Sequence, residues 1–444
     1  MTTTARPSVG DRVKALMAGD AQFRAAVPLS AIVEAKAPPE LNLAQIAAVV
    51  MEGYANRPAL AQRATRLVTE PVSGRRSLEL LDSFQALTYS ELWSRARALA
   101  GIWHHDADRS LRADEFLCIL AFAGIDFATV DLAAIHNGAV VVPVQTNAPL
   151  HQQAAIVQEV EPRWLACSLE CLENAVELVL TAWRPAGVLL FDYHPEVDDE
   201  RELFEAAQAR LAAAGLPQLL QTLPSLCEQG AALPPAPLHA AENAGDRLCT
   251  IYYTSGSTGA PKGAMYPEHM VRSVWRVMSP LPFVYVHYMP MNHSFGRSGM
   301  FSTLGNGGLC CFTAKSDLST LLDDIRLIRP TFMGIVPRIC ELIQQRFQAE
   351  LARRIGGAAV DAEGLRQALL AETREEVLGG RLLSCSFGSA PLSPELRAFM
   401  EECLGFPLDD NYGTREVSGV LRNTRITRPP VIDYKLDDVP ELGY

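Results

Sequence analysis

The stretch "IYYTSGSTGAPKGAMY", residues 251–266, combines residue types that could bind an anion. Three strand-forming residues lead into a turn that is rich in glycine and hydroxyl side chains and contains one lysine, Lys262, and no acid. Glycines let backbone N–H groups come close to a ligand, hydroxyls add donors, and a lysine adds a compact positive charge. This order predicts a phosphate-binding loop between a strand and a helix.

Two well-known phosphate patterns do not fit this loop. The pattern GxxxxGK[ST] fails because Pro261 stands where a glycine is required and Gly263 follows the lysine, and the pattern GxGxxG fails as well. The alternative is a flexible surface turn. The fixed places of the proline and the lysine within the stretch favour the phosphate loop.

Three later segments accompany the loop: "PMNHSFG" (290–296), "FGSAPLSPEL" (387–396) and "NYGTREVSG" (411–419). With "YTSGSTGAPKG" they resemble, in the same order, motifs of the adenylate-forming (AMP-binding) superfamily. "FDYHPEVDDERE", "VPVQTNAPL" and "RPPVIDYKLDDVPELGY" look more closely like the adenylation domain of bacterial carboxylic acid reductases. Free-standing fatty acyl-CoA ligases are the neighbouring interpretation.

The resemblance implies that a carboxylate oxygen attacks the α-phosphorus of ATP, which gives an acyl adenylate and pyrophosphate as the first step of acid reduction. A carboxylic acid with a pKa of about 4–5 is already ionised at neutral pH, so this step needs no general base. The site must align two anions and neutralise the departing pyrophosphate. The implied partners are therefore a small-molecule carboxylic acid and ATP, with Mg²⁺.

The resemblance also assigns roles to individual residues. His293 would orient the substrate carboxylate through an imidazole N–H, Lys262 would neutralise phosphate charge, and Glu416 would be both a catalytic residue and the Mg²⁺ ligand. The alternatives are a core or surface histidine and a solvated glutamate. The residues that would bind ATP come from the loop, an adenine-side turn and the Y-G-x-T-E segment: Thr254, Ser255, Gly256, Ser257, Thr258, Gly259, Lys262, Gly388, Ser389, Ala390, Pro391, Asn411, Tyr412, Gly413 and Thr414.

One position departs from the family pattern. Arg415 stands where the Y-G-x-T-E motif has threonine, and Thr414 precedes it. An arginine there could pair with an α-phosphate oxygen, or it could crowd Mg²⁺ and displace the usual hydroxyl contact. Both interpretations stay open.

The elements that must position these residues follow from an alternation of strand-length apolar runs with segments of helical period. This alternation predicts an α/β fold with two doubly wound, mostly parallel sheets covered by helices. The resemblance adds a partial β-barrel near the C-terminus. The expected divisions are an N-terminal helical extension (1–40), a first α/β subdomain (41–240), a second one with the phosphate loop (241–425) and the start of a β subdomain (426–444).

Particular elements can be assigned in the same way. Residues 116–122 and 139–144 read as strands, and residues 126–138 between them read as a helix closed by Gly138. Thr88, three residues before a glutamate, predicts a capping box at the start of another helix. The Pro-, Gly- and Ala-rich residues 216–246 read as neither helix nor strand and are expected to mark a boundary.

Composition excludes several classes of function. The 444 residues are 48% hydrophobic and 20% charged, which is typical of a packed globular protein. Lys+Arg at 39 against Asp+Glu at 51 gives a net charge of −12, so no nucleic-acid surface is expected. The ten cysteines contain no CxxC pair and favour buried thiols over a metal site. With no apolar N-terminal run, and with Asp131 and His136 interrupting the most apolar window, we expect a cytoplasmic protein without a membrane span.

The resemblance finally implies segments with no counterpart before Tyr444. These are a ribose-binding aspartate, a hinge and a small mobile C-terminal domain with a second lysine, then a phosphopantetheine carrier and an NADPH-dependent reductase. The expectation is a truncated and impaired acid-adenylating enzyme. The alternatives are a fragment of a fatty acyl-CoA ligase, a nucleotide- or acyl-binding module with little turnover because of Arg415 and the missing C-terminal domain, and an interaction scaffold.

Overall fold

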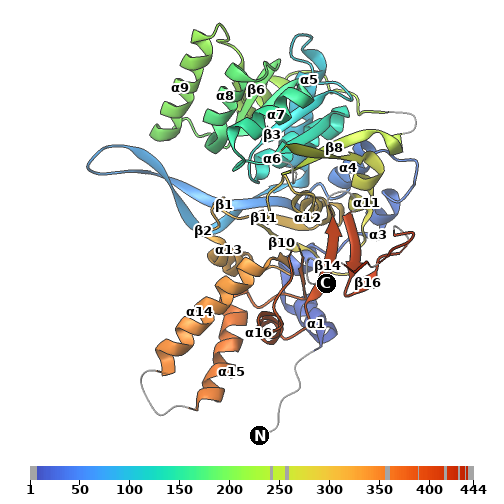
Figure 1. Cartoon of the computed structure of the whole chain (residues 1–444), viewed down its shortest axis with the longest axis vertical. Helices are drawn as coiled ribbons and strands as arrows, with labels where there is room; N and C mark the ends of the chain where they lie inside the picture. The colour runs from blue at the N-terminus through green and yellow to red at the C-terminus, as the bar shows by residue number, and fades with distance from the viewer. Residues whose placement is uncertain are drawn as a thin grey trace. The chain divides into compact units, whose positions relative to one another are not determined.

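The structure is a computed structural model that describes residues 8–240, 244–255, 260–355, 361–388, 390–414, 418–428, 431–435 and 437–438. It has an α/β fold with mixed sheets, which confirms the predicted fold class (Figure 1). The chain divides into two compact units. We call Pro7–Thr331 with Val377–Arg381 the N-terminal unit, and Phe332–Glu376 with Leu382–Tyr444 the C-terminal unit.

A seven-stranded sheet with the order β7-β6-β5-β3-β4-β8-β9 forms the centre of the N-terminal unit. Its neighbouring strands pair in parallel, except that β8 and β9 pair antiparallel. Strands β4, β5 and β6 are buried along their whole length, as parallel strands covered on both faces must be. The strands are β3 (Phe116–Leu120), β4 (Val140–Val144), β5 (Trp164–Ser168), β6 (Gly187–Phe191), β7 (Leu220–Thr222), β8 (Leu248–Ser255) and β9 (Pro261–Pro267).

The helices between these strands begin and end largely where the sequence predicts. Thr88 caps α5, because its hydroxyl accepts from the backbone N–H of Glu91 and the Glu91 carboxylate accepts in return from the backbone N–H of Thr88. Helix α6 ends at Gly138, whose φ of 76° lies in the left-handed region that glycine adopts easily. The helices are α5 (Tyr89–His105), α6 (Ile125–Asn137), α7 (Leu150–Val160), α8 (Leu172–Thr181), α9 (Asp198–Ala213) and α10 (Leu223–Ala231), with the short turns η1 (Leu169–Cys171) and η2 (Ala244–Asp246).

The prediction that residues 216–246 hold no regular structure is wrong for their first part. Strand β7 extends the sheet at its edge, and helix α10 begins directly after it. Leu223 and Leu226 are buried, and Pro224 stands in the first turn, where a helix tolerates proline. Burial against the rest of the unit therefore outweighs the weak local preferences of this stretch.

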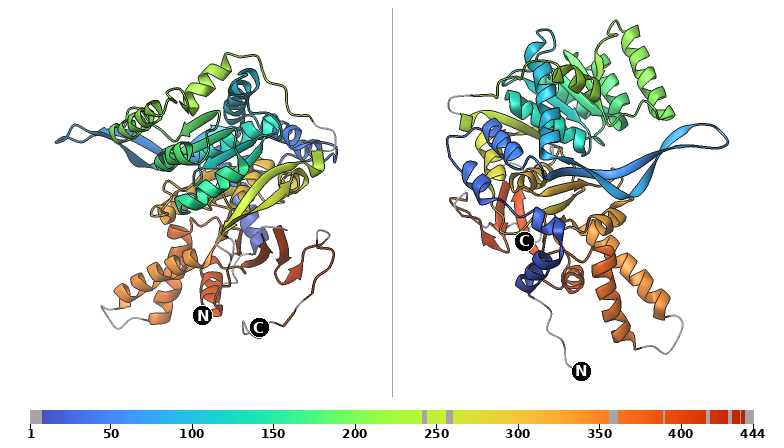
Figure 2. Two further views of the ribbon diagram at one scale, coloured as in Figure 1. Left: turned by 45° about the horizontal axis from the view of Figure 1, so that its top comes forward. Right: turned by 180° about the vertical axis from the view of Figure 1, so that it is seen from behind.

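Four more strands lie in the N-terminal unit in the order β10-β11-β1-β2. Strands β10, β11 and β1 run parallel, and β1 pairs antiparallel with β2 in a long hairpin that is clear in Figures 1 and 2. This hairpin is not among the elements that the sequence predicts. The strands are β1 (Pro58–Thr69), β2 (Arg76–Thr88), β10 (Val284–His287) and β11 (Leu309–Phe312), and the accompanying helices are α1 (Val9–Gly19), α2 (Ala21–Ala25), α3 (Ser30–Ala35), α4 (Leu43–Gly53), α11 (Glu268–Arg276), α12 (Ser294–Gly305) and α13 (Leu321–Ile328).

In its described residues, the C-terminal unit has five strands in the order β12-β13-β14-β15-β16. The first three run parallel, and the last two add antiparallel pairs. Helices α14 and α15 lie side by side, as Figures 1 and 2 show. The elements are β12 (Phe332–Ile335), β13 (Ser384–Phe387), β14 (Asp409–Thr414), β15 (Ser418–Arg422) and β16 (Arg425–Ile426), with α14 (Pro337–Ile355), α15 (Ala362–Glu372), the π-turn η3 (Thr373–Val377) and α16 (Pro394–Leu404).

The cysteines are free thiols, and all except the partly exposed Cys227 are buried, as their apolar surroundings predict. Burial raises the pKa of Cys171 to about 11. In the described part of the chain, no group of three or more His, Cys, Asp or Glu side chains could hold a metal ion. Across the same residues, none of the helices combines the length and the apolar character needed to span a bilayer.

Candidate functional site

The predicted phosphate loop connects two antiparallel strands. Strand β8 carries Thr254 and Ser255 at its end, and β9 begins at Pro261, so that Thr254 stands opposite Lys262 in the pairing. The expected order of strand, loop and helix is therefore wrong. A second strand comes first, and helix α11 follows at Glu268. A loop in a β-hairpin does not receive the dipole of a following helix, so anion binding must depend on its own N–H groups, its hydroxyls and the lysine.

The hairpin holds the ends of the loop close together. The hydroxyl of the half-buried Thr254 donates to the backbone carbonyl of Lys262, with 3.4 Å between the oxygens, and the Lys262 side chain is exposed. A Cβ on Gly263 would come within 2.6 Å of the Ile251 side chain, so only glycine permits this approach across the pair. The remaining predicted loop residues, Gly256, Ser257, Thr258 and Gly259, lie outside the described residues, and only the backbone of Ser255 is described.

His293 is the N-cap of helix α12. Its Nδ1 accepts a hydrogen bond from the backbone N–H of Phe295 at 3.2 Å. A neutral imidazole that accepts at Nδ1 carries its proton on Nε2. This tautomer provides the N–H donor that the proposed role with a carboxylate requires, on a side chain that is only half-buried.

Two hydrogen bonds and one close backbone approach fix the turn that contains His293. The backbone N–H of Met291 donates to the carbonyl of Phe122, with an N–O distance of 2.9 Å. The Nε2 of His287, at the end of β10, lies 2.9 Å from the carbonyl of Gly296 in the first turn of α12. A Cβ on Gly296 would stand only 2.3 Å from the carbonyl oxygen of Pro290, so this residue must be glycine for the turn to close.

A buried arginine connects the helix that carries His293 to the strand that leads into the loop. Arg297, one turn after His293 on α12, forms a two-pronged ion pair with Asp131 on α6, with N–O distances of 2.9 and 2.6 Å. Its Nη1 also lies 2.7 Å from the Thr250 hydroxyl and 3.1 Å from the Tyr252 hydroxyl, both on β8. One guanidinium therefore bonds to elements α6 and β8 from its place on α12.

This network is inaccessible to water, since the side chains of Arg297 and Asp131 are 1% and 0% exposed. Burial raises the pKa of the Asp131 carboxyl, while the opposing guanidinium lowers it. The pKa of Tyr252 is raised to about 12, mainly by burial, so this phenol stays neutral and can accept from the arginine. An isolated charge would be very costly here, so the two ions depend on each other. Arg297 is not among the site residues that the sequence predicts. The available signal was Asp131, an acid in the middle of a mostly apolar helix whose other acid, Asp126, lies in the first turn.

The C-terminal unit holds the residues predicted for the adenine side. Gly388 follows β13, and a Cβ on it would come within 2.9 Å of the Asn411 carbonyl on the neighbouring β14. The structure thus brings these two predicted segments together. Ala390 and Pro391 are exposed, and Asn411, Tyr412, Gly413 and Thr414 form most of β14.

Tyr412 is 56% exposed, which leaves much of its ring accessible for stacking on a planar group. Ser389 and Glu416 were also predicted in this unit, and Arg415 was singled out as a departure from the family pattern. All three lie outside the described residues.

Known proteins are similar to this chain over most of its length. The family profile described as "AMP-binding enzyme" matches residues 53–440. A carboxylic acid reductase of Mycobacterium tuberculosis is 47% identical over 440 residues, which cover 98% of this chain and 37% of that reductase. The chain therefore spans little more than a third of the length of this curated relative.

Solved structures with similar sequences show the same fold. The A domain of the carboxylic acid reductase from Segniliparus rugosus, in complex with AMP and a co-purified carboxylic acid, has a TM-score of 0.93 at 41% identity, covering 99% of this chain and 70% of that one. The A-PCP didomain of the carboxylic acid reductase from the same organism, in complex with AMP, has a TM-score of 0.92 at 41% identity, covering 99% of this chain and 61% of that one.

Proposed function

The chain belongs to the AMP-binding enzyme family, and we propose that it activates a carboxylic acid with ATP, giving an acyl adenylate and pyrophosphate as the first step of the acid's reduction. The observation that carries this proposal is the similarity of the whole chain to a solved A domain that holds both AMP and a carboxylic acid. The two ligand classes in that relative are the two reactants that acid adenylation requires.

In this proposal the β8–β9 hairpin binds the phosphates. Thr254 and Lys262 stand on its two strands where the loop begins and ends, and the loop residues 255–259 supply the remaining donors. The ammonium of Lys262 offsets the negative charge that develops on the departing pyrophosphate. Mg²⁺, when bound with Glu416 as its ligand, would neutralise further phosphate charge.

His293 orients the acid. Its Nε2–H donates to one carboxylate oxygen, and the other oxygen is then directed at the α-phosphorus. The carboxylate is already ionised, so the histidine positions it without taking a proton. The adenine side is formed by Gly388, Ser389, Ala390 and Pro391 on one wall and by residues 411–414 on the other, with the exposed ring of Tyr412 stacking on the base.

We further propose that a longer protein passes the acyl group on. A carrier domain with phosphopantetheine would accept it, and a reductase domain with NADPH would release the aldehyde. The support is that the similar reductase is much longer than this chain and that a solved relative is an A-PCP didomain.

Acid-dependent exchange of labelled pyrophosphate into ATP tests the proposed activity. We expect exchange only when a carboxylic acid is present, and a loss of about 100- to 1000-fold in Lys262→Ala, since removing one charge-stabilising group typically costs this much. Lys315→Ala removes an exposed lysine with no assigned role and should leave the rate unchanged. An exchange rate that does not depend on added acid, over a panel of aliphatic and aromatic acids, would contradict the proposal.

A further inference from the structure

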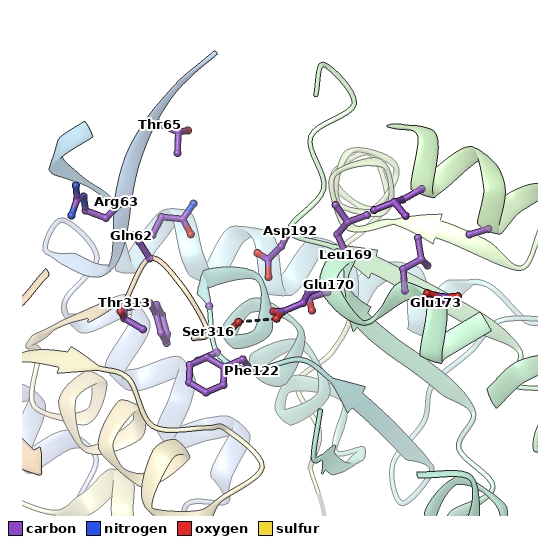
Figure 3. Close-up of a pocket in the computed structure, with 18 of the residues that line it drawn as sticks. Gln62, Arg63, Thr65, Phe122, Leu169, Glu170, Glu173, Asp192, Thr313 and Ser316 are labelled. Atoms are coloured by element: carbon purple, nitrogen blue, oxygen red, sulfur yellow. Dashed lines mark hydrogen bonds between the residues drawn. The ribbon is translucent and has the colours of Figure 1, made fainter. Parts of the chain in front are cut away.

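A cavity of about 760 Å³ lies in the N-terminal unit, and its lining contains none of the residues assigned to ATP or to the acid (Figure 3). Its walls come from the ends of β3, β5, β6 and β11, from helices α8 and α9, and from the β1–β2 hairpin. The proposed adenylation does not use this cavity.

The cavity lies at the place where a doubly wound sheet usually binds small ligands. From β3 the chain passes through α6 to β4 on one side, and it then returns through α7 to β5 on the other side of β3. Such a reversal opens a crevice at the carboxyl ends of the two central strands. Phe122 follows β3, Ser168 ends β5 and Asp192 follows β6, and all three line the cavity.

Three carboxylates line the cavity: Glu170, Glu173 and Asp192. In Figure 3, Glu170 and Asp192 lie close together along one side of it, and Glu170 accepts a hydrogen bond from the Ser316 hydroxyl at 2.7 Å. None of the three acids has an ion-pair partner among the residues that the structure describes.

The two arginines in the wall do not compensate these acids. Arg63 is bound to the buried Asp324 at 2.9 Å, and Arg210 is bound to Glu177 at 2.7 Å. Both partners lie outside the cavity wall. The lining therefore has an excess of negative charge.

The excess of negative charge affects the Asp192 carboxyl directly. Its pKa is raised well above the usual range, first by burial and then by the charges of Asp126 on α6, Glu200 on α9 and Glu170 on η1, with His194 opposing them. A cation placed beside this carboxyl would offset the repulsion from the neighbouring acids and favour its ionised form.

A second polar group in the wall lacks a full partner. Ser168 is 6% exposed, and apart from a weak interaction with the Cys171 thiol its Oγ has no hydrogen-bond partner among the described residues. Buried hydroxyls are normally fully hydrogen-bonded, so one in a cavity wall with only a weak thiol contact still has a lone pair for a ligand atom. Phe122, Phe312 and Leu203 supply apolar surface in the same wall.

We propose that this cavity binds a small organic ammonium ion with an apolar body. The ammonium group lies against Asp192 and Glu170 and bonds to the Ser168 hydroxyl, and the apolar body packs on Phe122 and Phe312. Recognition of this kind combines a few placed polar groups with mostly apolar walls.

Titration calorimetry on the whole chain tests the site with two probes, 4-phenylbutylamine and its neutral counterpart 4-phenylbutan-1-ol. We expect the amine to bind with one-to-one stoichiometry and at least about tenfold more tightly than the alcohol, since a charged hydrogen bond is typically worth that much. This comparison needs no variant. Equal affinities, or no binding of the amine at millimolar concentration, would overturn the proposal.

The variant Asp192→Asn locates the binding site. Asparagine preserves the shape and tolerates the left-handed backbone of this residue, whose φ is 52°. We expect the amine to bind at least about tenfold more weakly to this variant. Asp199→Asn removes the same charge from an exposed side chain outside the cavity and should change nothing. Unchanged affinity in Asp192→Asn, or displacement of the amine by ATP and acid, would show that the amine binds elsewhere, whether or not the chain adenylates acids.

Discussion

Replacing Arg297 should separate the contribution of the buried network to stability from its contribution to catalysis. Among the described residues, the guanidinium is the only ion-pair partner of the fully buried Asp131, and it also bonds to Thr250 and Tyr252. Arg297→Met keeps the unbranched stem and leaves an uncompensated buried carboxylate. We expect the free energy of unfolding to fall by about 3–5 kcal/mol. Arg66→Met, which breaks an exposed pair with Glu79, should cost less than about 1 kcal/mol.

The double replacement Arg297→Met with Asp131→Leu removes both charges, and leucine keeps the branched shape of aspartate. Because no ion then remains unpaired, the double variant should lose less stability than either single variant. Its pyrophosphate exchange should nevertheless stay well below the wild-type rate, since α12 is no longer bonded to β8 through Thr250 and Tyr252. We expect the rate loss mainly in kcat. Neither single variant, which keeps one of the two charges, should restore the wild-type rate.

Denaturant melts and exchange kinetics on the four proteins of this cycle measure both quantities. Additive losses of stability would refute the coupling between Arg297 and Asp131. A stable double variant with wild-type exchange would refute the positioning role of the network and leave it purely structural.

Two further predictions concern the turn that carries His293. Gly296→Ala places a Cβ against the Pro290 carbonyl, so it should lower the free energy of unfolding by about 1–3 kcal/mol and reduce pyrophosphate exchange. In Gly299→Ala, on the same helix, the added Cβ meets only the far end of the Tyr285 side chain, so this control should cost less. Thermal melts and exchange rates that rank the two variants the other way would contradict this. Burial lowers the pKa of the fully buried His287 to about 4. Below about pH 6.5 the folded state therefore binds fewer protons than the unfolded state. The free energy of unfolding should fall by about 3 kcal/mol as the pH drops from 6.5 towards 4. Denaturant melts over this pH range should show a shallower loss for His287→Phe, and an identical pH dependence would contradict the assignment.

The sequence predicted the helices and strands that are determined by residues close together in the chain. The β3–α6–β4 unit, the Thr88 cap and the Gly138 stop each depend on residues within one or two turns of the chain. The β1–β2 hairpin does not, because its charged residues hide the strand period and its pairing with β11 joins Leu60 to Cys310. Such long-range pairing leaves no local pattern to read.

The residues of the candidate site likewise divide into those that a local motif indicates and those that only the folded chain brings together. Lys262 and His293 could be singled out because their motifs are contiguous, whereas Arg297 and Asp131 are 166 positions apart and meet only in the folded chain. The strand after the phosphate loop was missed since Pro261 and Gly263 argue locally against a strand. Pairing with β8 overrides this preference, and Pro261 stands at the first position of the strand, where it is tolerated.

The most direct test of acid adenylation follows an oxygen atom. With a carboxylic acid labelled with ¹⁸O in both carboxyl oxygens, and with hydroxylamine to release the acyl group, attack of the carboxylate on the α-phosphorus leaves one labelled oxygen in AMP. Mass spectrometry of the nucleotide should therefore find AMP that carries a single ¹⁸O and unlabelled pyrophosphate. Label in inorganic phosphate, with ADP as the nucleotide product, would show an acyl phosphate route and contradict the account.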